Sequence, residues 1–294
     1  MKTLITGASG LIGSALVEYL FQQGHSIQCL KRNPHNKNTP FWAIQSLPDN
    51  SDAVFSAVIH LAGENVAQGR WTAAKKKRIL QSRVDGTREL VDYISLLPVK
   101  PDVFLTASAI GFYGNRGDDL ISENSPGGEG FLADVCRQWE QETKRLTTMN
   151  IRVVTLRFGM VLSPKGGALH KMIPPFKANL GGTIGSGKQY ISWISIRDLI
   201  QIVDFIINNK QISGPVNIVS PIQTTNGELT KILGRALGSR PFLKIPAFVV
   251  KLIFGQMAKE MLLSSTRVTP TVLLENDYTF RDQSLAAVIS HCTK

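Results

Sequence analysis

Three glycines near the start of the chain have the spacing of a phosphate-binding turn. Gly7, Gly10 and Gly13 lie in TGASGLIG at 6–13, between an apolar run at 3–6 and a segment with helical periodicity. At such a junction, glycines let backbone amides approach a pyrophosphate, and the helix N-terminus adds partial positive charge. We therefore predict a dinucleotide-binding turn rather than one that only packs a helix against a strand. The other predicted contacts of this turn are Ser9, Leu11 and Ile12.

The residues after the second apolar run, 26–30, indicate which dinucleotide is bound. NAD-binding proteins usually place Asp or Glu here, against the ribose 2′-hydroxyl. This chain has Lys31 and Arg32 instead. A carboxylate would repel a 2′-phosphate, whereas Arg32 can bind it in bidentate fashion and Lys31 can add a point charge. The sequence predicts NADP(H) as the cofactor; the alternative is that both are ordinary surface cations.

The elements that must position these residues alternate along the chain. Apolar runs of strand length occur at 3–6, 26–30, 53–61, 103–107, 153–157 and 216–219. Helical periodicity occurs at 14–23, 82–96, 131–149, 198–208, 226–237 and 246–263. Such alternation predicts an α/β fold with a Rossmann-type doubly wound parallel sheet.

The pattern changes after about residue 162, where glycines and prolines interrupt the chain up to residue 187. We expect residues 1–162 to form the NADP-binding domain, with 190–220 returning to it. Residues 163–189 and 221–294 then form a smaller substrate or cap lobe.

Composition sets limits on the class of protein. The chain has 294 residues, 43% hydrophobic and 19% charged, which is typical of a soluble globular protein. No apolar stretch reaches the length of a membrane span, so we expect no membrane partner. Three cysteines lie far apart, which predicts no disulfide framework, no metal site and a reducing cytoplasmic location.

A net charge of +11 and the basic run at 75–78 raise the question of an anionic partner. Basic runs without interleaved aromatic residues are seldom nucleic-acid platforms. We interpret the run as a solvated helix face and expect no nucleic-acid partner.

The order of several segments resembles that of the extended and atypical short-chain dehydrogenase/reductase superfamily, which includes nucleotide-sugar epimerases and dehydratases. The segments are TGASGLIG at 6–13, VIHLAGEN at 58–65, SRVDGTREL at 82–90, TASAIGFYG at 106–114 and RFGMVL at 157–162. Within that superfamily, FLADVCRQWE and MLLSSTRVTP are similar to an epimerase-family branch of unassigned function. This resemblance implies further cofactor contacts at His60, Leu61, Ala62, Gly63, Glu64, Arg83 and Val161.

The resemblance also implies a serine, then a tyrosine with a lysine four residues later, which relay a proton. Ser108 fits the serine, but residues 131–137 read FLADVCR and contain neither tyrosine nor lysine. Tyr113 is the nearest phenol, and in the wider superfamily that tyrosine lines the substrate cleft. We take Ser108 and Tyr113 as the catalytic candidates, and Cys136 as a buried structural thiol.

Two functional hypotheses follow. The first is an NADP(H)-dependent oxidoreductase or epimerase/dehydratase-like enzyme with an atypical active site and a small, nucleotide-sugar-like substrate. The second is a non-catalytic NADPH-binding sensor or partner-binding protein. Lys171, Arg197, Arg267 and the loop 185–190 are candidates for contacting an anionic substrate, while Trp193 is expected to pack.

Overall fold

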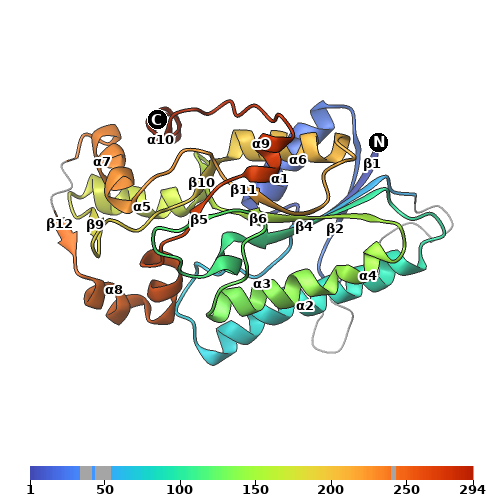
Figure 1. Ribbon diagram of the computed structural model, residues 1–294, viewed down its shortest axis with the longest axis horizontal. Coiled ribbons are helices and arrows are strands. Elements are labelled where there is room, and N and C mark those ends of the chain that lie inside the picture. The colour runs from blue at the N-terminus through green and yellow to red at the C-terminus, as the bar shows by residue number, and fades with distance from the viewer. Residues whose placement is uncertain (34–41, 44–53, 240–242, 294) are drawn as a thin grey trace.

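The computed structural model describes residues 1–33, 42–43, 54–239 and 243–293. Its centre is a six-stranded parallel sheet in the order β11-β6-β4-β3-β1-β2 (Figure 1). The strands are β1 (Lys2–Thr6), β2 (Ser26–Leu30), β3 (Ala57–His60), β4 (Val103–Ala109), β6 (Arg152–Phe158) and β11 (Gly214–Ile218). The chain adds β2 on one side of β1 and then crosses to β3 on the other, so the doubly wound Rossmann prediction is confirmed.

Helices cover both faces of this sheet (Figure 1). One face carries α1 (Leu11–Gln22), α6 (Ile196–Asn208) and α9 (Thr271–Glu275), and the other carries α2 (Ala73–Leu96), α3 (Phe131–Glu142) and α4 (Lys144–Thr147). Successive strand residues point to opposite faces. Ile5 therefore belongs to the apolar core under α1 and α6, and Leu4 to the core under α2. Burial on both faces explains why the strands are continuous apolar runs.

Several predicted elements have different bounds in the structure. Helix α2 begins at Ala73 rather than at 82, because the Thr72 side chain accepts a hydrogen bond from the Lys75 amide and caps it there. The predicted helix 131–149 is divided at Thr143 into α3 and α4. Strand β3 begins at Ala57, later than the predicted 53–61, and residue 53 of that range lies outside the described residues.

A second group of elements has its own apolar core. It contains β7 (Met160–Ser163), β8 (Gly166–Gly167), α5 (Ala168–Lys177), β9 (Gly182–Ile184), β10 (Trp193–Ser195), α7 (Asn226–Ala236), β12 (Leu243–Ile245) and α10 (Leu285–Thr293). Trp193 packs in this core with 1% of its surface exposed, as predicted, and its indole nitrogen donates to Thr224 Oγ1.

Short elements join the two groups. The turn η2 (Ile110–Tyr113) follows β4, and β5 (Leu120–Ile121) pairs with β13 (Arg267–Val268). Helix α8 (Ala247–Phe254) precedes η3 (Ala258–Leu262), a π-helical turn in place of the end of the predicted helix 246–263.

Candidate functional site

The register of the sheet brings three predicted segments to one edge. Thr6, the last residue of β1, pairs with Leu30 of β2 and with His60 of β3. The glycine turn, the Lys31–Arg32 pair and the loop 61–64 therefore all leave the sheet at neighbouring positions. Strand order reverses between β1 and β3, and at such a switch point open α/β sheets bind their ligands.

The glycine turn needs its glycines for steric reasons. Gly7 has a φ of +74°, and a Cβ atom there would lie 2.8 Å from the Ala62 backbone nitrogen. A Cβ atom on Gly13 would lie 2.2 Å from the Gly7 carbonyl oxygen, which itself accepts a 3.0 Å hydrogen bond from the Gly10 amide. Backbone is therefore packed against backbone, and the cradle stays open for a phosphate group.

Helix α1 begins at this turn with exposed backbone. Gly10 is its N-cap, and within the described part of the chain no side chain caps it. Ser9 and Gly10 are exposed, whereas Leu11 and Ile12 are half-buried and anchor the first turn. The amides of α1 and the turn thus fit an anionic pyrophosphate, which the helix dipole favours.

Residues of β7 and β8 approach the same turn. A Cβ atom on Gly167 would lie 3.1 Å from Leu11 Cδ2 and 3.3 Å from the carbonyl oxygen of Val161. Val161 is half-buried against the core under α1. The predicted contact Val161 therefore lies close to the glycine turn, although 150 residues separate it from Leu11 in the sequence.

The two predicted phosphate-binding cations lie at the end of β2. Lys31 and Arg32 are both exposed. Arg32 is close enough to Glu64 to help lower the pKa of that carboxyl, although the hydrogen bond from Lys75 lowers it most. Arg32 and loop 61–64 therefore lie near each other at this edge of the sheet.

The basic run at 75–78 is only partly solvated, which corrects the prediction for Lys75. Its side chain is 7% exposed, and its ammonium group lies 2.7 Å from Glu64 Oε1. The Arg78 guanidinium lies 3.8 Å from the same oxygen. A buried lysine beside loop 61–64 fixes Glu64 and leaves the remaining cations at the surface.

Arg83 contacts the backbone of loop 61–64. Its Nη1 atom donates to the Glu64 carbonyl oxygen at 3.0 Å and to the Ile79 carbonyl oxygen at 3.2 Å. The guanidinium lies 5.1 Å from the centre of the Trp139 ring, and a Cβ atom on Gly63 would lie 3.0 Å from Arg83 Cζ. Loop 61–64 thus passes directly over a fixed cation.

The side chain of His60 lies in the core and not at the surface where the glycine turn and loop 61–64 leave the sheet. Its ring has no exposed surface and lies 2.7 Å from Thr6 Oγ1 and 2.9 Å from Thr87 Oγ1. Burial, and secondarily Arg83, lowers its pKa to about 3. A neutral His60 joins β1, β3 and α2, so only its main chain is available to a cofactor.

Ser108 belongs to a buried ionic network. Its hydroxyl donates to Glu140 Oε1 at 2.6 Å, and only 3% of the residue is exposed. Arg157 binds both oxygens of the same carboxylate, at 3.0 and 2.8 Å. Neither Glu140 nor Arg157 was predicted from the sequence. The signal for Arg157 is a charged residue inside an apolar strand run, and the signal for Glu140 is a charged residue on the apolar side of α3.

Tyr113 extends this network. It is fully buried. Its hydroxyl donates to Asn217 Oδ1 at 2.8 Å and accepts from Arg157 Nη1 at 2.9 Å. These two hydrogen bonds join η2 to β6 and β11.

The start of α3 holds apolar side chains where the tyrosine and lysine are expected. Phe131 and Leu132 pack with Trp71 and Met257. Their backbone amides donate to Glu260 of η3, at 3.2 and 2.8 Å. Glu260, which was not predicted from the sequence, therefore caps α3, although it lies 128 residues after Leu132 in the sequence.

Cys136 follows one turn later and is 3% exposed, and burial raises its pKa to about 11. This confirms the prediction of a structural thiol, because an exposed thiolate is what a nucleophile requires.

The predicted substrate contacts have different surroundings. Lys171 donates to the Ala67 carbonyl oxygen at 2.7 Å and connects α5 to the chain after loop 61–64. Arg197 forms an ion pair with Asp282, away from that loop. Arg267 lies 5.0 Å from the centre of the Tyr190 ring, and its buried Nε has no hydrogen-bond partner among the described residues. Of these three cations, Lys171 and Arg197 have hydrogen-bond or ion-pair partners, and Arg267 has a nitrogen without one among the described residues.

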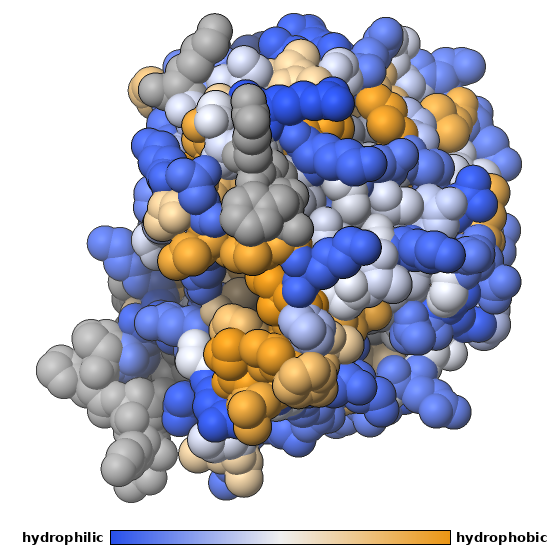
Figure 2. Space-filling model, turned by 90° about the vertical axis from the view of Figure 1, so that its left-hand side faces the viewer, coloured by the Kyte–Doolittle hydropathy of each residue, from blue (hydrophilic) through white to orange (hydrophobic). Residues whose placement is uncertain are grey.

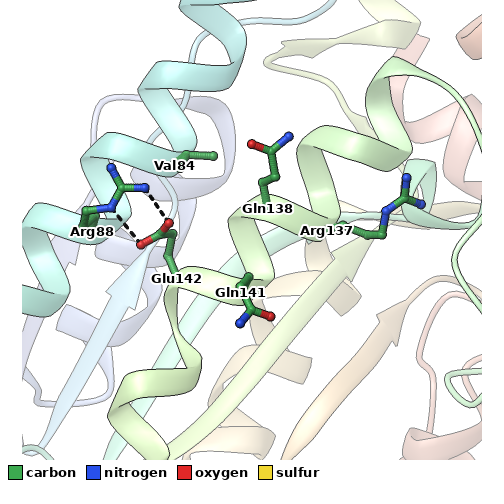
Figure 3. Close-up of a pocket in the computed structure, with 6 residues that line it drawn as sticks. All are labelled: Val84, Arg88, Arg137, Gln138, Gln141 and Glu142. Atoms are coloured by element: carbon green, nitrogen blue, oxygen red, sulfur yellow. Dashed lines mark hydrogen bonds and ion pairs between the residues drawn. The ribbon is translucent and has the colours of Figure 1, made fainter.

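One surface depression lies outside this site. It has a volume of about 330 Å³ and lies between α2 and α3 (Figure 3). Its lining is Val84, Arg88, Arg137, Gln138, Gln141 and Glu142. It shares no residue with the glycine turn or loop 61–64.

Among the described residues, no three His, Cys, Asp or Glu side chains converge as a metal site, and no helix is long and apolar enough to cross a membrane.

Comparison with known proteins agrees with this geometry. The NAD dependent epimerase/dehydratase family matches residues 3–219, and a domain of unknown function, DUF1731, matches residues 245–292. An epimerase family protein of Mycobacterium tuberculosis is 37% identical over 292 residues, with 98% of this chain and 96% of that protein covered.

Solved structures give the same result. The crystal structure of the human epimerase family protein SDR39U1 with NADPH has a TM-score of 0.90 at 33% identity and covers 99% of both chains. The nucleoside-diphosphate sugar epimerase from Corynebacterium glutamicum has a TM-score of 0.79 at 34% identity, with 99% of this chain and 57% of that chain covered. The likeness extends over the whole sheet and the glycine turn, and the chain belongs to the NAD dependent epimerase/dehydratase family.

Proposed function

We propose that the chain is an NADP(H)-dependent oxidoreductase or epimerase/dehydratase-like enzyme with an atypical active site. The observation that carries this proposal is the open glycine cradle at the switch point of the sheet, with Lys31 and Arg32 exposed at the end of the neighbouring strand. The human relative that was crystallised with NADPH supports the choice of cofactor.

Different residues of the chain bind different parts of the cofactor. Gly7, Gly10 and Gly13 present backbone amides to the pyrophosphate. Arg32 and Lys31 neutralise the 2′-phosphate. Residues 61–64, supported by Arg83, border the nicotinamide half. When bound, the nicotinamide supplies or accepts a hydride.

The accompanying proton comes from a group other than a tyrosine–lysine pair. Residues 131–137 contain neither, and Tyr113 is enclosed in the core. We propose that the second group of elements, together with the short strands that join it to the sheet, binds a small substrate with an anionic group. Arg267, stacked on Tyr190, offers that group a positive charge.

The three free cysteines fit the cytoplasmic location expected from the sequence.

The cofactor assignment is tested by titrating the protein with NADPH and with NADH, followed by intrinsic fluorescence. We expect tighter binding of NADPH, and the variant Arg32→Glu is expected to weaken NADPH binding by roughly tenfold or more while sparing NADH. Arg235→Glu, an exposed position on α7, makes the same change in net charge and serves as the control. An unchanged NADPH preference in Arg32→Glu would exclude the proposed phosphate contact.

The second candidate function is a non-catalytic NADPH sensor, which the apolar start of α3 and the buried Ser108 and Tyr113 favour. The two candidates differ in hydride transfer. Single-turnover oxidation of bound NADPH, followed at its absorbance band across a broad panel of carbonyl substrates, supports the enzyme. Tight NADPH binding without oxidation by any substrate supports the sensor.

A further inference from the structure

Helix α8 leaves its apolar side chains uncovered. Of its eight residues, only Val250 is buried. Phe248 is 71% exposed, Leu252 75%, Ile253 54% and Phe254 37%. We call these four side chains the α8 surface. It belongs to the C-terminal segment that matches a domain of unknown function.

These side chains form a group rather than isolated exposed positions. Phe248 and Leu252 are four residues apart on one helix, so they lie on the same side of it. On the end of the molecule where α8 lies, orange side chains gather into a patch bordered by blue ones (Figures 1 and 2). Grouped apolar side chains with a polar border mark interaction surfaces, whereas single exposed apolar residues are normal.

The charged residues along this segment are mainly basic. Lys251 lies in α8 itself, and Lys244 and Lys259 lie in the elements directly before and after it. All three are exposed. The nearby carboxylate, Glu260, is occupied by the start of α3 and by Gln256. Among the described residues, none of these three lysines forms an ion pair, so positive charge lies beside the apolar side chains of the α8 surface.

This combination determines the kind of partner. A second copy of the chain carries the same lysines and the same net charge of +11, so two α8 surfaces would repel each other. A bilayer containing anionic phospholipid instead complements both features, because its headgroups attract lysines and its acyl boundary accepts phenyl and leucyl groups. Helix α8 is eight residues long, which suits lying in an interface and not crossing it.

We propose that the α8 surface docks the protein onto anionic membranes as a peripheral contact. Phe248, Leu252 and Ile253 enter the headgroup region, and Lys244, Lys251 and Lys259 contact lipid phosphates. The earlier expectation of no membrane partner rested on the lack of a spanning segment and does not apply to such a contact.

The full chain offers a sensitive reporter for this contact. Its four tryptophans, Trp42, Trp71, Trp139 and Trp193, are each less than 9% exposed. A tryptophan introduced as Leu252→Trp is therefore the main one able to respond to lipid. With phosphatidylcholine vesicles containing phosphatidylglycerol, we expect a blue shift of its emission and quenching by brominated acyl chains. Phe21→Trp, at a position on α1 that is 72% exposed, is the control and should show neither.

Vesicle co-sedimentation measures the affinity. The double variant Phe248→Ser/Leu252→Ser should weaken binding to anionic vesicles roughly tenfold or more. Lys251→Gln should weaken it roughly fivefold, and added salt should weaken it further. The control Phe21→Ser/Leu96→Ser changes two side chains that are 72% and 71% exposed and should bind as the unchanged protein does.

Three results would overturn the proposal. They are absence of binding to anionic vesicles, equal loss of binding in the control double variant, and a self-associated chain that Phe248→Ser/Leu252→Ser converts to monomers. The last result would identify a second copy as the occupant. Circular dichroism melting, expected to be unchanged in these surface variants, separates loss of docking from loss of folding.

Discussion

Helices α1 and α3 start in similar ways and have different consequences. Each follows a glycine that provides no capping side chain, Gly10 for α1 and Gly130 for α3. At α1 the exposed turn remains open to a phosphate group. At α3 the carboxylate of Glu260 accepts hydrogen bonds from the Phe131 and Leu132 amides. One helix start is available for a ligand, and the other is already bound by the protein.

This difference separates cofactor binding from the usual proton relay. The first helix start keeps the residues that a dinucleotide requires, because backbone-to-backbone contacts at Gly7 and Gly13 leave room for no other residue type. The second has apolar residues and a capping carboxylate where the superfamily has its tyrosine. The network behind α3, Ser108–Glu140–Arg157, joins that helix to β4 and β6.

The largest expected effect comes from that network. Glu140→Ala leaves the guanidinium of Arg157, which is 5% exposed, without its carboxylate. Removing one partner of a buried ion pair lowers the free energy of unfolding by about 3–5 kcal/mol. Urea unfolding followed by circular dichroism measures the change.

Glu142→Ala is the matched control on the same helix. Glu142 pairs with Arg88 (Figure 3), and the Arg88 side chain is 48% exposed, so loss of this pair should change the free energy of unfolding by about 1 kcal/mol or less. Equal stability of Glu140→Ala and Glu142→Ala would contradict a structural role for the network and would favour a catalytic role for Ser108.

Local rules predicted the glycine turn and the sheet, because both depend on backbone geometry and on apolar periodicity within short segments. Ser108 and Tyr113 were interpreted from the short sequence segments that contain them. In the structure, Ser108 bonds to Glu140, 32 residues away. Tyr113 bonds to Arg157 and to Asn217, which are 44 and 104 residues away. Glu260 likewise acts 128 residues from Leu132. Contacts over such separations leave no periodic signal in a single sequence.

The second prediction tests the helix start at α1. Gly13→Ala places a methyl group 2.2 Å from the Gly7 carbonyl oxygen, whereas Gly10→Ala places one at 3.3 Å. We expect Gly13→Ala to lower the free energy of unfolding by about 1–3 kcal/mol and to weaken NADPH binding. Gly10→Ala should weaken binding while leaving the melting temperature nearly unchanged. Equal melting temperatures for the two variants would contradict the steric account of this turn.

The third prediction concerns pH at the end of β3, beside the glycine turn. The pKa of His60 falls from 6.5 to about 3 on folding, so between these values the unfolded chain binds a proton that the folded chain excludes. Stability is therefore lost as the pH falls below 6.5, by about 2 kcal/mol at pH 5. His60→Gln should remove this part of the acid slope in urea titrations at several pH values. His170→Gln, at an exposed position, should retain it.

The smallest expected effect tests the helix start at α3. Glu260→Gln removes the negative charge that meets the Phe131 and Leu132 amides, which should lower the free energy of unfolding by about 1 kcal/mol. Glu275→Gln, at an exposed position on α9, makes the same change in charge and should have little effect. Because this helix start is assigned a structural role, NADPH affinity and turnover per folded molecule should stay unchanged in Glu260→Gln. A large loss of turnover with unchanged stability would instead place the reacting groups at α3 and remove the contrast between the two helix starts.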